Sequence, residues 1–264
     1  MTTHFSSGVT NVPGKGQATS LFSGIKQPLI TGGEDKEVAY QDDFVSFSSA
    51  TAGPWDVTDT GSGYQVIDYA GGWLRVGDGA PASGEVNGIS GKEVWNYNAN
   101  KLWYYETRIS LTDVTEGNFF VGFADNGFVD PATVPTDCIG FSHLEDTTTI
   151  QFLSRKNSGG VSFDMLEAGS TFAMLDSTVA TQDATTFEMP SNSVRLGFMF
   201  QPVSSSPGVT AVQYQLFIDG TVSGTQAATT VPDDIALEVK IFIENKGTAA
   251  NDLNTDYIKT VQQR

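Results

Sequence analysis

The chain has 264 residues, and 31 acidic against 14 basic residues give it a formal net charge of −17 at pH 7. This charge excludes direct binding of nucleic acid and docking on an anionic membrane as expected functions, because both need a basic surface. The lone cysteine, Cys138, cannot form an internal disulfide, and the chain is long enough to bury one large core.

Residues 1–40 differ from the rest, and we predict that they form an extended N-terminal arm. They are rich in Gly, Ser and Thr, and residues 1–33 hold two lysines and no acid, so these residues carry +2 and the remainder −19. Such a composition cannot fold alone, which favours either an arm that docks on a partner or a disordered tail. The residues that we expect to bind a partner are isolated apolar side chains and both lysines: Phe5, Val9, Val12, Lys15, Leu21, Phe22, Ile25, Lys26, Leu29 and Ile30. The opening "MTTHFSSGVTNV" has no basic region followed by an apolar run, as a signal peptide would, which favours synthesis in a cytoplasm.

From residue 41 onward the sequence reads as short strands between turns, and no apolar run is long enough to span a membrane. We therefore predict a single β-sandwich domain over 41–264. The predicted strands are 43–48, 64–69, 73–77, 102–112, 118–124, 137–143, 148–154, 160–165, 194–202, 210–219, 235–244 and 255–262.

The alternation of apolar and polar residues is clearest in "IALEVKIFI", residues 235–243. Ile241 lies on the apolar face of this strand and Lys240 on the other, so we expect aspartate to be tolerated at 240 but not at 241. Asp219-Gly220 predicts a tight hairpin turn. The sequence contains no helical stretch. We therefore predict an all-β protein, with two antiparallel sheets packed face to face.

The order of these elements resembles the concanavalin A-like (lectin-like) jelly roll. The likeness is carried by "LWYYETRISLTDVTEGNFFVGFAD", "DCIGF", "SVRLGFMF", "YQLFIDGTVSGT" and "TDYIKTVQQR". It extends over residues 41–264 and is informative about fold more than about activity.

A second resemblance concerns both ends of the chain. "MTTHFSSGVTNV" is similar to the openings of tailed-phage structural proteins, and "DYIKTVQQR" to the endings of lectin-like phage virion proteins. The resemblance implies a non-enzymatic structural protein of a bacteriophage virion, made in the host cytoplasm. Its expected role is capsid decoration or cementing, as an oligomer held by its arm to the major capsid protein or another virion protein. The alternative that it implies is a carbohydrate-binding appendage or a receptor-binding tail component.

The sequence holds no complete catalytic motif, and we expect neither enzyme activity nor a cofactor. Glucanases of the concanavalin-like fold carry Glu-x-Asp-x-x-Glu on one strand, and "SFDMLE" supplies Asp164 and Glu167 but has Ser162 in place of the first Glu. The two histidines are His4 and His143. A Ser-His-Asp site is not expected, because the sequence has no Gly-x-Ser-x-Gly elbow for the nucleophilic serine. No phosphate-binding loop is complete.

No metal site is expected. One cysteine and two distant histidines argue against zinc. The oxygen ligands of calcium are offered by "ADNGFVDPATVPTD", which holds Asp125, Asn126, Asp130 and Asp137. This stretch lacks the ligand spacing of an EF-hand, and Asp and Asn beside Gly and Pro are turn formers first.

Aromatic residues are the candidates for sugar binding. They are Trp55, Tyr64, Tyr69, Trp73, Trp95, Tyr97 and Tyr104, with the densest cluster in "GKEVWNYNANKLWYY". We name Trp95, Tyr97 and Tyr104 as the candidate glycan face. The alternative is that these rings are core residues or cross-strand pairs.

Overall fold

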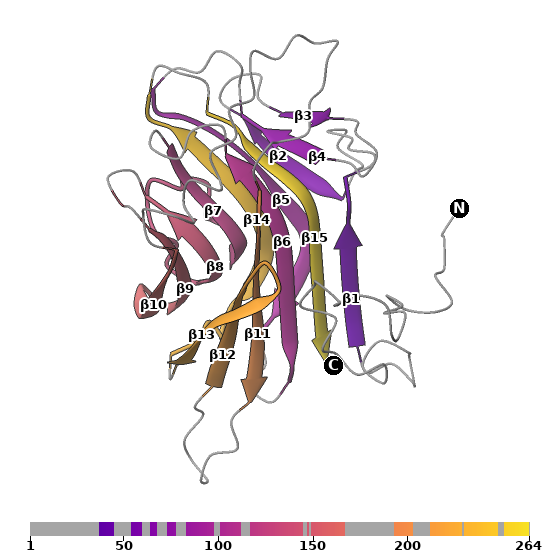
Figure 1. Cartoon of the computed structure of the whole chain (residues 1–264), viewed down its shortest axis with the longest axis vertical. Helices are drawn as coiled ribbons and strands as arrows, with labels where there is room; N and C mark the ends of the chain where they lie inside the picture. The colour runs from indigo at the N-terminus through magenta and orange to yellow at the C-terminus, as the bar shows by residue number, and fades with distance from the viewer. Residues whose placement is uncertain are drawn as a thin grey trace, which may run out of the picture.

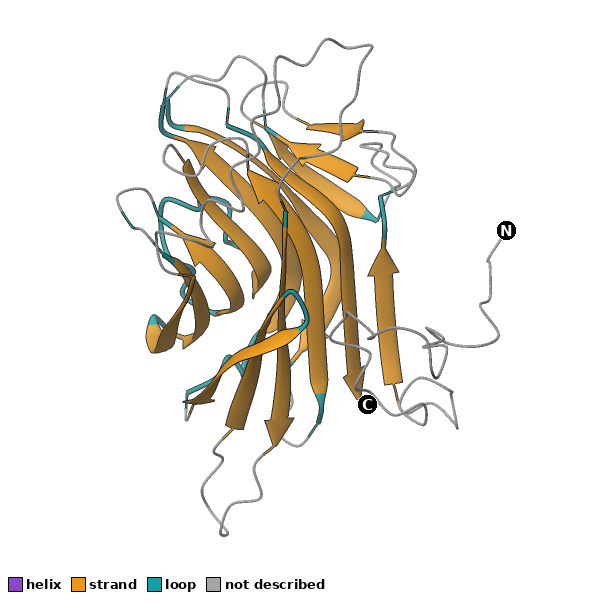
Figure 2. Cartoon of the chain, in the orientation of Figure 1, coloured by secondary structure: helices purple, strands orange, loops and turns teal. Residues whose placement is uncertain are grey.

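The computed structural model of the chain describes residues 37–44, 54–59, 64–67, 73–77, 83–97, 101–111, 117–144, 147, 149–166, 193–202, 212–228, 230–247 and 251–263. These residues contain strands and turns and no helix, and the strands form two antiparallel sheets (Figures 1 and 2). The prediction of an all-β antiparallel sandwich is confirmed. No helix capable of crossing a membrane occurs in the described part of the chain.

The eight-stranded sheet has the order β13-β12-β11-β6-β15-β4-β3, with β1 paired to the free end of β15. Its strands are β1 (Glu37–Asp42), β3 (Tyr64–Ile67), β4 (Trp73–Val76), β6 (Trp103–Leu111), β11 (Val194–Pro202), β12 (Val212–Ile218), β13 (Thr221–Ala228) and β15 (Leu253–Gln263). β4 pairs with residues 253–255 of β15, and β1 pairs with residues 258–263, so both lie on the same side of that strand.

The seven-stranded sheet has the order β10-β9-β8-β7-β14-β5-β2. Its strands are β2 (Trp55–Asp59), β5 (Glu85–Asn96), β7 (Gly117–Asp125), β8 (Cys138–His143), β9 (Ile150–Lys156), β10 (Gly159–Leu166) and β14 (Ala236–Asn245). Figure 1 shows the two sheets stacked as layers, with β14 and β15 both near the middle of their sheets.

The core lies between the sheets and is built largely from aromatic rings. Period-2 alternation sends every second side chain of each strand inward, and the inward positions of β6, β7 and β11 hold Trp103, Tyr105, Phe123 and Phe198. Phe123 packs edge-on against Tyr105 with ring centroids 5.2 Å apart, and Tyr105 stacks on Phe198 at 5.4 Å. Such rings bury large apolar areas, which makes this layer the main source of stability.

Two predictions about the N-terminal side differ from the structure. β1 begins at Glu37, so the sandwich starts there and not at residue 41. Of the predicted strand 43–48, residues 43 and 44 are not in a strand and the others lie outside the described residues. The arm up to residue 36, with all ten of its proposed binding residues, also lies outside them.

The turn at Asp219-Gly220 is confirmed, since both residues have positive φ, 50° and 78°. Four strands were missed altogether, namely β1, β2, β5 and β13. The other face of "IALEVKIFI" was also misjudged. Lys240 is 2% exposed and Phe242 fully buried, because a loop covers the outer face of β14.

Candidate ligand-binding groove

The outer face of the seven-stranded sheet is partly covered by the loop of residues 126–137, which joins β7 to β8. Phe128 of this loop packs edge-on against Phe120 of β7 and Phe242 of β14, with ring centroids 5.1 and 5.8 Å apart. These rings form a second, smaller apolar cluster outside the sandwich, with Leu153 and Val134 beside them. The loop is therefore packed onto the sheet as part of the folded body.

Lys240 holds the start of this loop to the sheet. Its Nζ donates to Ser90 Oγ at 2.9 Å, to the carbonyl oxygen of Asn126 at 3.4 Å, and pairs with Glu238 Oε2 at 2.9 Å. These partners satisfy an ammonium group that would otherwise be buried alone, at a high cost in free energy.

Three acidic residues in or beside the same loop accept hydrogen bonds that hold it in place. Asp130 Oδ1 accepts the amide hydrogen of Ala132 at 2.9 Å. Asp137 Oδ1 accepts that of Asn157, in the β9–β10 turn, at 2.9 Å. Asp125 Oδ2 accepts the hydroxyl of Thr136 at 3.3 Å. Asp130 thus forms a turn with the backbone two residues on, whereas Asp125 and Asp137 join segments that are distant in the sequence. No three His, Cys, Asp or Glu side chains gather as metal ligands among the described residues.

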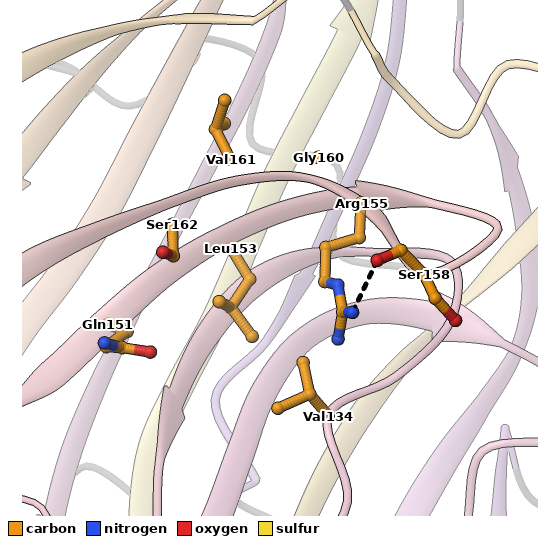
Figure 3. Close-up of a pocket in the computed structure, with 8 residues that line it drawn as sticks. All are labelled: Val134, Gln151, Leu153, Arg155, Ser158, Gly160, Val161 and Ser162. Atoms are coloured by element: carbon orange, nitrogen blue, oxygen red, sulfur yellow. Dashed lines mark hydrogen bonds between the residues drawn. The ribbon is translucent and has the colours of Figure 1, made fainter.

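Beside the loop, a groove of about 310 Å³ opens over β9 and β10. Its lining residues are Val134, Gln151, Leu153, Arg155, Ser158, Gly160, Val161 and Ser162. In Figure 3, Gln151, Leu153 and Arg155 project to one side of β9 and Val134 approaches them from the loop. The pairing of β9 with β10 brings these lining residues together, because Ser162 lies opposite Leu153 and Gly160 opposite Arg155.

The lining of the groove is mainly polar, around a small apolar floor at Leu153 and Val134. Arg155 Nη2 donates to the carbonyl oxygen of Ser158 at 2.6 Å, which fixes the guanidinium at the rim (Figure 3). Gln151 Nε2 donates to Asp164 Oδ1 at 2.8 Å. An apolar patch with a few oriented polar groups is typical of a binding site for a small polar ligand. The lining includes no histidine, cysteine or paired carboxylates.

The candidate glycan face is not formed. Trp95 is 3% exposed and stacks on Trp103 in the core, with ring centroids 6.1 Å apart. Tyr97 also lies in the core, 4.9 Å from Phe200 between centroids, whereas Tyr104 lies on the outer face of the other sheet. The prediction of one exposed face built from these three rings is wrong. Aromatic rings bury large apolar areas, and this favours their placement in the core between the sheets.

The remaining candidates for chemistry are placed as follows. Ser162 and Asp164 lie exposed on β10, and Glu167 is outside the described residues. His143 ends β8 and is buried, with Nδ1 3.1 Å from the carbonyl oxygen of Thr149. Cys138 is fully buried, and burial raises the pKa of its thiol.

Sequence reasoning missed the groove itself. The alternation of Gln151, Leu153 and Arg155 with Ile150 and Phe152 could have shown which side chains of β9 point outward. It could not have shown that the 126–137 loop would supply the opposite wall.

Comparison with known proteins settles the type of sandwich. No family model matches the chain, and no curated protein matches it. Among solved structures, peanut lectin has a TM-score of 0.52 at 8% identity, over 86% of this chain and 98% of that one. The fold is a lectin-like jelly roll.

Two further structures agree with this fold. Arcelin-5 from Phaseolus vulgaris, described as a lectin-like defense protein, has a TM-score of 0.50 at 8% identity, over 86% of this chain and 99% of its own. The carbohydrate recognition domain of Emp46p has a TM-score of 0.50 at 9% identity, over 83% and 94%. At such low identity the likeness shows the fold alone.

Proposed function

We propose that the chain is a non-enzymatic structural protein of a bacteriophage virion, of the capsid decoration type, whose N-terminal arm attaches the lectin-like sandwich to the particle. The observation that carries the proposal is the division of the chain into a basic segment and a strongly acidic folded body. Residues 1–33 carry +2 and the remaining 12 basic and 31 acidic residues give −19. The similarity of both chain ends to phage virion proteins supports the same role.

The residues that follow the arm are bonded firmly to the sandwich. β1 follows the arm directly and pairs with β15 over six residues, from Glu37 opposite Gln263 to Asp42 opposite Ile258. Asp42 Oδ2 then accepts the indole hydrogen of Trp55 at 2.8 Å, which ties the end of β1 to the other sheet. The end of the arm is therefore connected to both sheets, through β15 in one and Trp55 of β2 in the other.

Deletion of residues 1–33 tests the attachment. We expect the truncated chain to keep the β-type circular dichroism of the full chain, because β1 and the sandwich are retained, and to lose co-sedimentation with purified capsids that lack the protein. A fusion of residues 1–36 to an unrelated soluble protein should gain co-sedimentation. A truncated chain that still fills its sites on the capsid would place the attachment in the sandwich.

A carbohydrate-binding appendage is the second candidate, and the groove beside Arg155 favours it. Guanidinium, amide and hydroxyl groups around an apolar floor suit a sugar, and one structure of similar fold is named as a carbohydrate recognition domain. A glycan array with the full chain tests this function. Binding that is lost in Arg155→Ala and kept in Lys92→Ala, a half-exposed residue on β5, would support it, and a blank array would oppose it.

A further inference from the structure

The dipeptide Asn-Gly occurs twice in the chain, at Asn87-Gly88 and at Asn126-Gly127, and the fold places the two copies in opposite surroundings. The backbone nitrogen of the residue that follows an asparagine can attack the side-chain amide of that asparagine. Glycine hinders this attack least, because it has no Cβ. The two copies therefore allow the effect of the fold on this reaction to be compared within one molecule.

Asn126-Gly127 is the exposed copy. Both residues are exposed and lie in the tight turn that follows β7, which is closed by a hydrogen bond of 3.1 Å from the amide of Phe128 to the carbonyl oxygen of Asp125. Within the described part of the chain, the amide of Gly127 itself makes no hydrogen bond. The attacking nitrogen and the amide that it attacks are thus both within reach of water and hydroxide, and no strand has to open first.

Asn87-Gly88 is the protected copy. Asn87 is 2% exposed and lies in β5, which is paired with β14 on one side and β2 on the other. Gly88 lies opposite Phe242 of β14 and opposite Thr58 of β2. Its nitrogen can reach the side chain of Asn87 only after the backbone has left the sheet. Openings of this kind cost free energy, whereas a turn that is already exposed needs little.

We propose that Asn126 is a site of spontaneous modification, at which the folded chain converts the asparagine to aspartate and isoaspartate without another protein. The nitrogen of Gly127 loses its proton to hydroxide and forms a bond to Cγ of Asn126, while the bond from Cγ to Nδ2 breaks. Nδ2 takes a proton from water and leaves as ammonia, so that a cyclic imide remains. Water then opens this ring, either at Cγ, which gives aspartate, or at the main-chain carbonyl carbon, which gives isoaspartate.

The isoaspartate product changes the loop that forms one wall of the groove. It lengthens the main chain by a methylene group just before Phe128, whose ring packs the 126–137 loop onto the sheet. The carbonyl oxygen of Asn126, which accepts from Lys240 Nζ at 3.4 Å, becomes part of a free carboxylate outside the main chain. The aspartate product keeps the original main chain and adds only an exposed charge. Modification therefore loosens the loop through isoaspartate, and this effect does not depend on the proposed virion role.

Incubation of the full chain at mildly alkaline pH, followed by proteolysis and mass spectrometry of the peptides, tests the proposal. We expect residue 126 to convert at least about tenfold faster than residue 87, because conversion at residue 87 must wait for β5 to open. In urea the two sites should convert at similar rates. Gly127→Ala should slow the conversion at residue 126, because its methyl group lies beside the attacking nitrogen. The nearest atom to that methyl group is Asp125 Oδ1 at 3.1 Å, the end of a side chain that can turn away.

The melting temperature separates the effects of the two products. The isoaspartate form, isolated by ion exchange, should melt below the unmodified chain, whereas Asn126→Asp, which adds the charge without the longer main chain, should melt with it. An isoaspartate form that melts like the unmodified chain overturns the effect on the loop.

Three further outcomes overturn the proposed site. The first is equal conversion, or none, at residues 87 and 126 of the folded chain. The second is an unchanged rate in Gly127→Ala, which would mean that water attacks the side chain directly. The third is slow conversion of residue 87 in urea as well, which would mean that the neighbouring sequence, and not the fold, separates the two sites.

Discussion

Lys240 shows how one residue can be placed on the correct face of a strand and still be misjudged. It points away from the sandwich, as its position in β14 predicts, yet the 126–137 loop covers it and leaves 2% of it exposed. The expectation that aspartate would be tolerated there fails on this geometry. A carboxylate at residue 240 would lie buried beside Glu238, which now pairs with the lysine.

We therefore predict that Lys240→Asp lowers the free energy of unfolding by about 3–5 kcal/mol, because it removes one partner of a buried pair. Lys240→Met, which keeps the length and loses the charge, should cost less. Lys92→Asp is the matched control, since Lys92 pairs with Asp56 at an exposed site, and its cost should stay within about 1 kcal/mol. Urea unfolding at pH 7 measures all three, and equal midpoints for the two aspartate variants would contradict the role of Lys240.

A second prediction concerns the thiol of Cys138. The residue is fully buried, so a reagent cannot reach its sulfur atom. Burial also raises the pKa of the thiol, so the thiolate does not form at neutral pH. We expect no reaction with a disulfide reagent in the native protein and one equivalent per chain after unfolding in urea. Reaction in the native state at the rate of a small free thiol would show that the outer face of β8 opens.

At the scale of elements, the strands with strong alternation were predicted and those without it were not. β6, β7 and β14 repeat large apolar residues at every second position, and their predicted bounds fall within a few residues of the observed ones. β5 has glycines at residues 88 and 91, which read as breaks. The structure gives the reason for Gly88, because a Cβ there would be 2.3 Å from the ring of Phe242 on the neighbouring strand. The ring of Phe242 fills the space that a side chain at residue 88 would occupy. Because Phe242 is distant in the sequence, no local pattern around Gly88 reveals this contact.

The same limit applies to the groove and to the aromatic residues. The groove requires the 126–137 loop to fold back over β8 and β9, and this depends on contacts of Phe128 and Val134 with distant strands. The position of Trp95 in its strand determines on which face of the strand the ring lies. It does not determine which face of the sheet is buried in the sandwich. Fold class could therefore be predicted, and the site could not.

The pair Gly122 and Gly140 supplies an element-scale prediction. These residues face each other on β7 and β8, and a Cβ on Gly140 would lie 2.6 Å from the carbonyl oxygen of Val121 and 2.9 Å from Cα of Gly122. Because both neighbours are backbone atoms, the two strands must separate to admit a methyl group. We predict that Gly140→Ala lowers the free energy of unfolding by about 1–3 kcal/mol.

Gly159→Ala is the control for this change, since the nearest atom to a Cβ there is 3.5 Å away, an ordinary contact distance. Thermal unfolding followed by circular dichroism compares the two variants. Similar melting temperatures would mean that β7 and β8 are not in such close contact.

At the scale of the whole molecule, buried tyrosines make the fold sensitive to alkali. Burial is the main cause that raises the pKa of Tyr97, Tyr105, Tyr214 and Tyr257 above the ordinary value of about 10. The folded state then holds these phenol protons more tightly than the unfolded state does. The resulting stability is complete below the unfolded pKa and is lost as pH rises above it.

We predict that a titration followed at 295 nm ionises these four tyrosines only together with loss of the β signal in circular dichroism. In urea, all eight tyrosines of the chain should titrate near pH 10. If all eight ionise near pH 10 while the dichroism stays native, the phenols are open to solvent in the folded state.

The place of β15 in the eight-stranded sheet determines when that sheet can form. β15 lies between β6 on one side and β4 and β1 on the other, so the first described strand of the chain finds its partner in the last. During synthesis, β1, β4 and β6 leave the ribosome without the strand that joins them. Pairing across so many intervening residues is slow, since the entropy of closing the loop is lost before contacts are gained. The edge of β6 that pairs with β15 must therefore stay unpaired until residues 253–263 emerge, and the sandwich closes only after most of its translation is over.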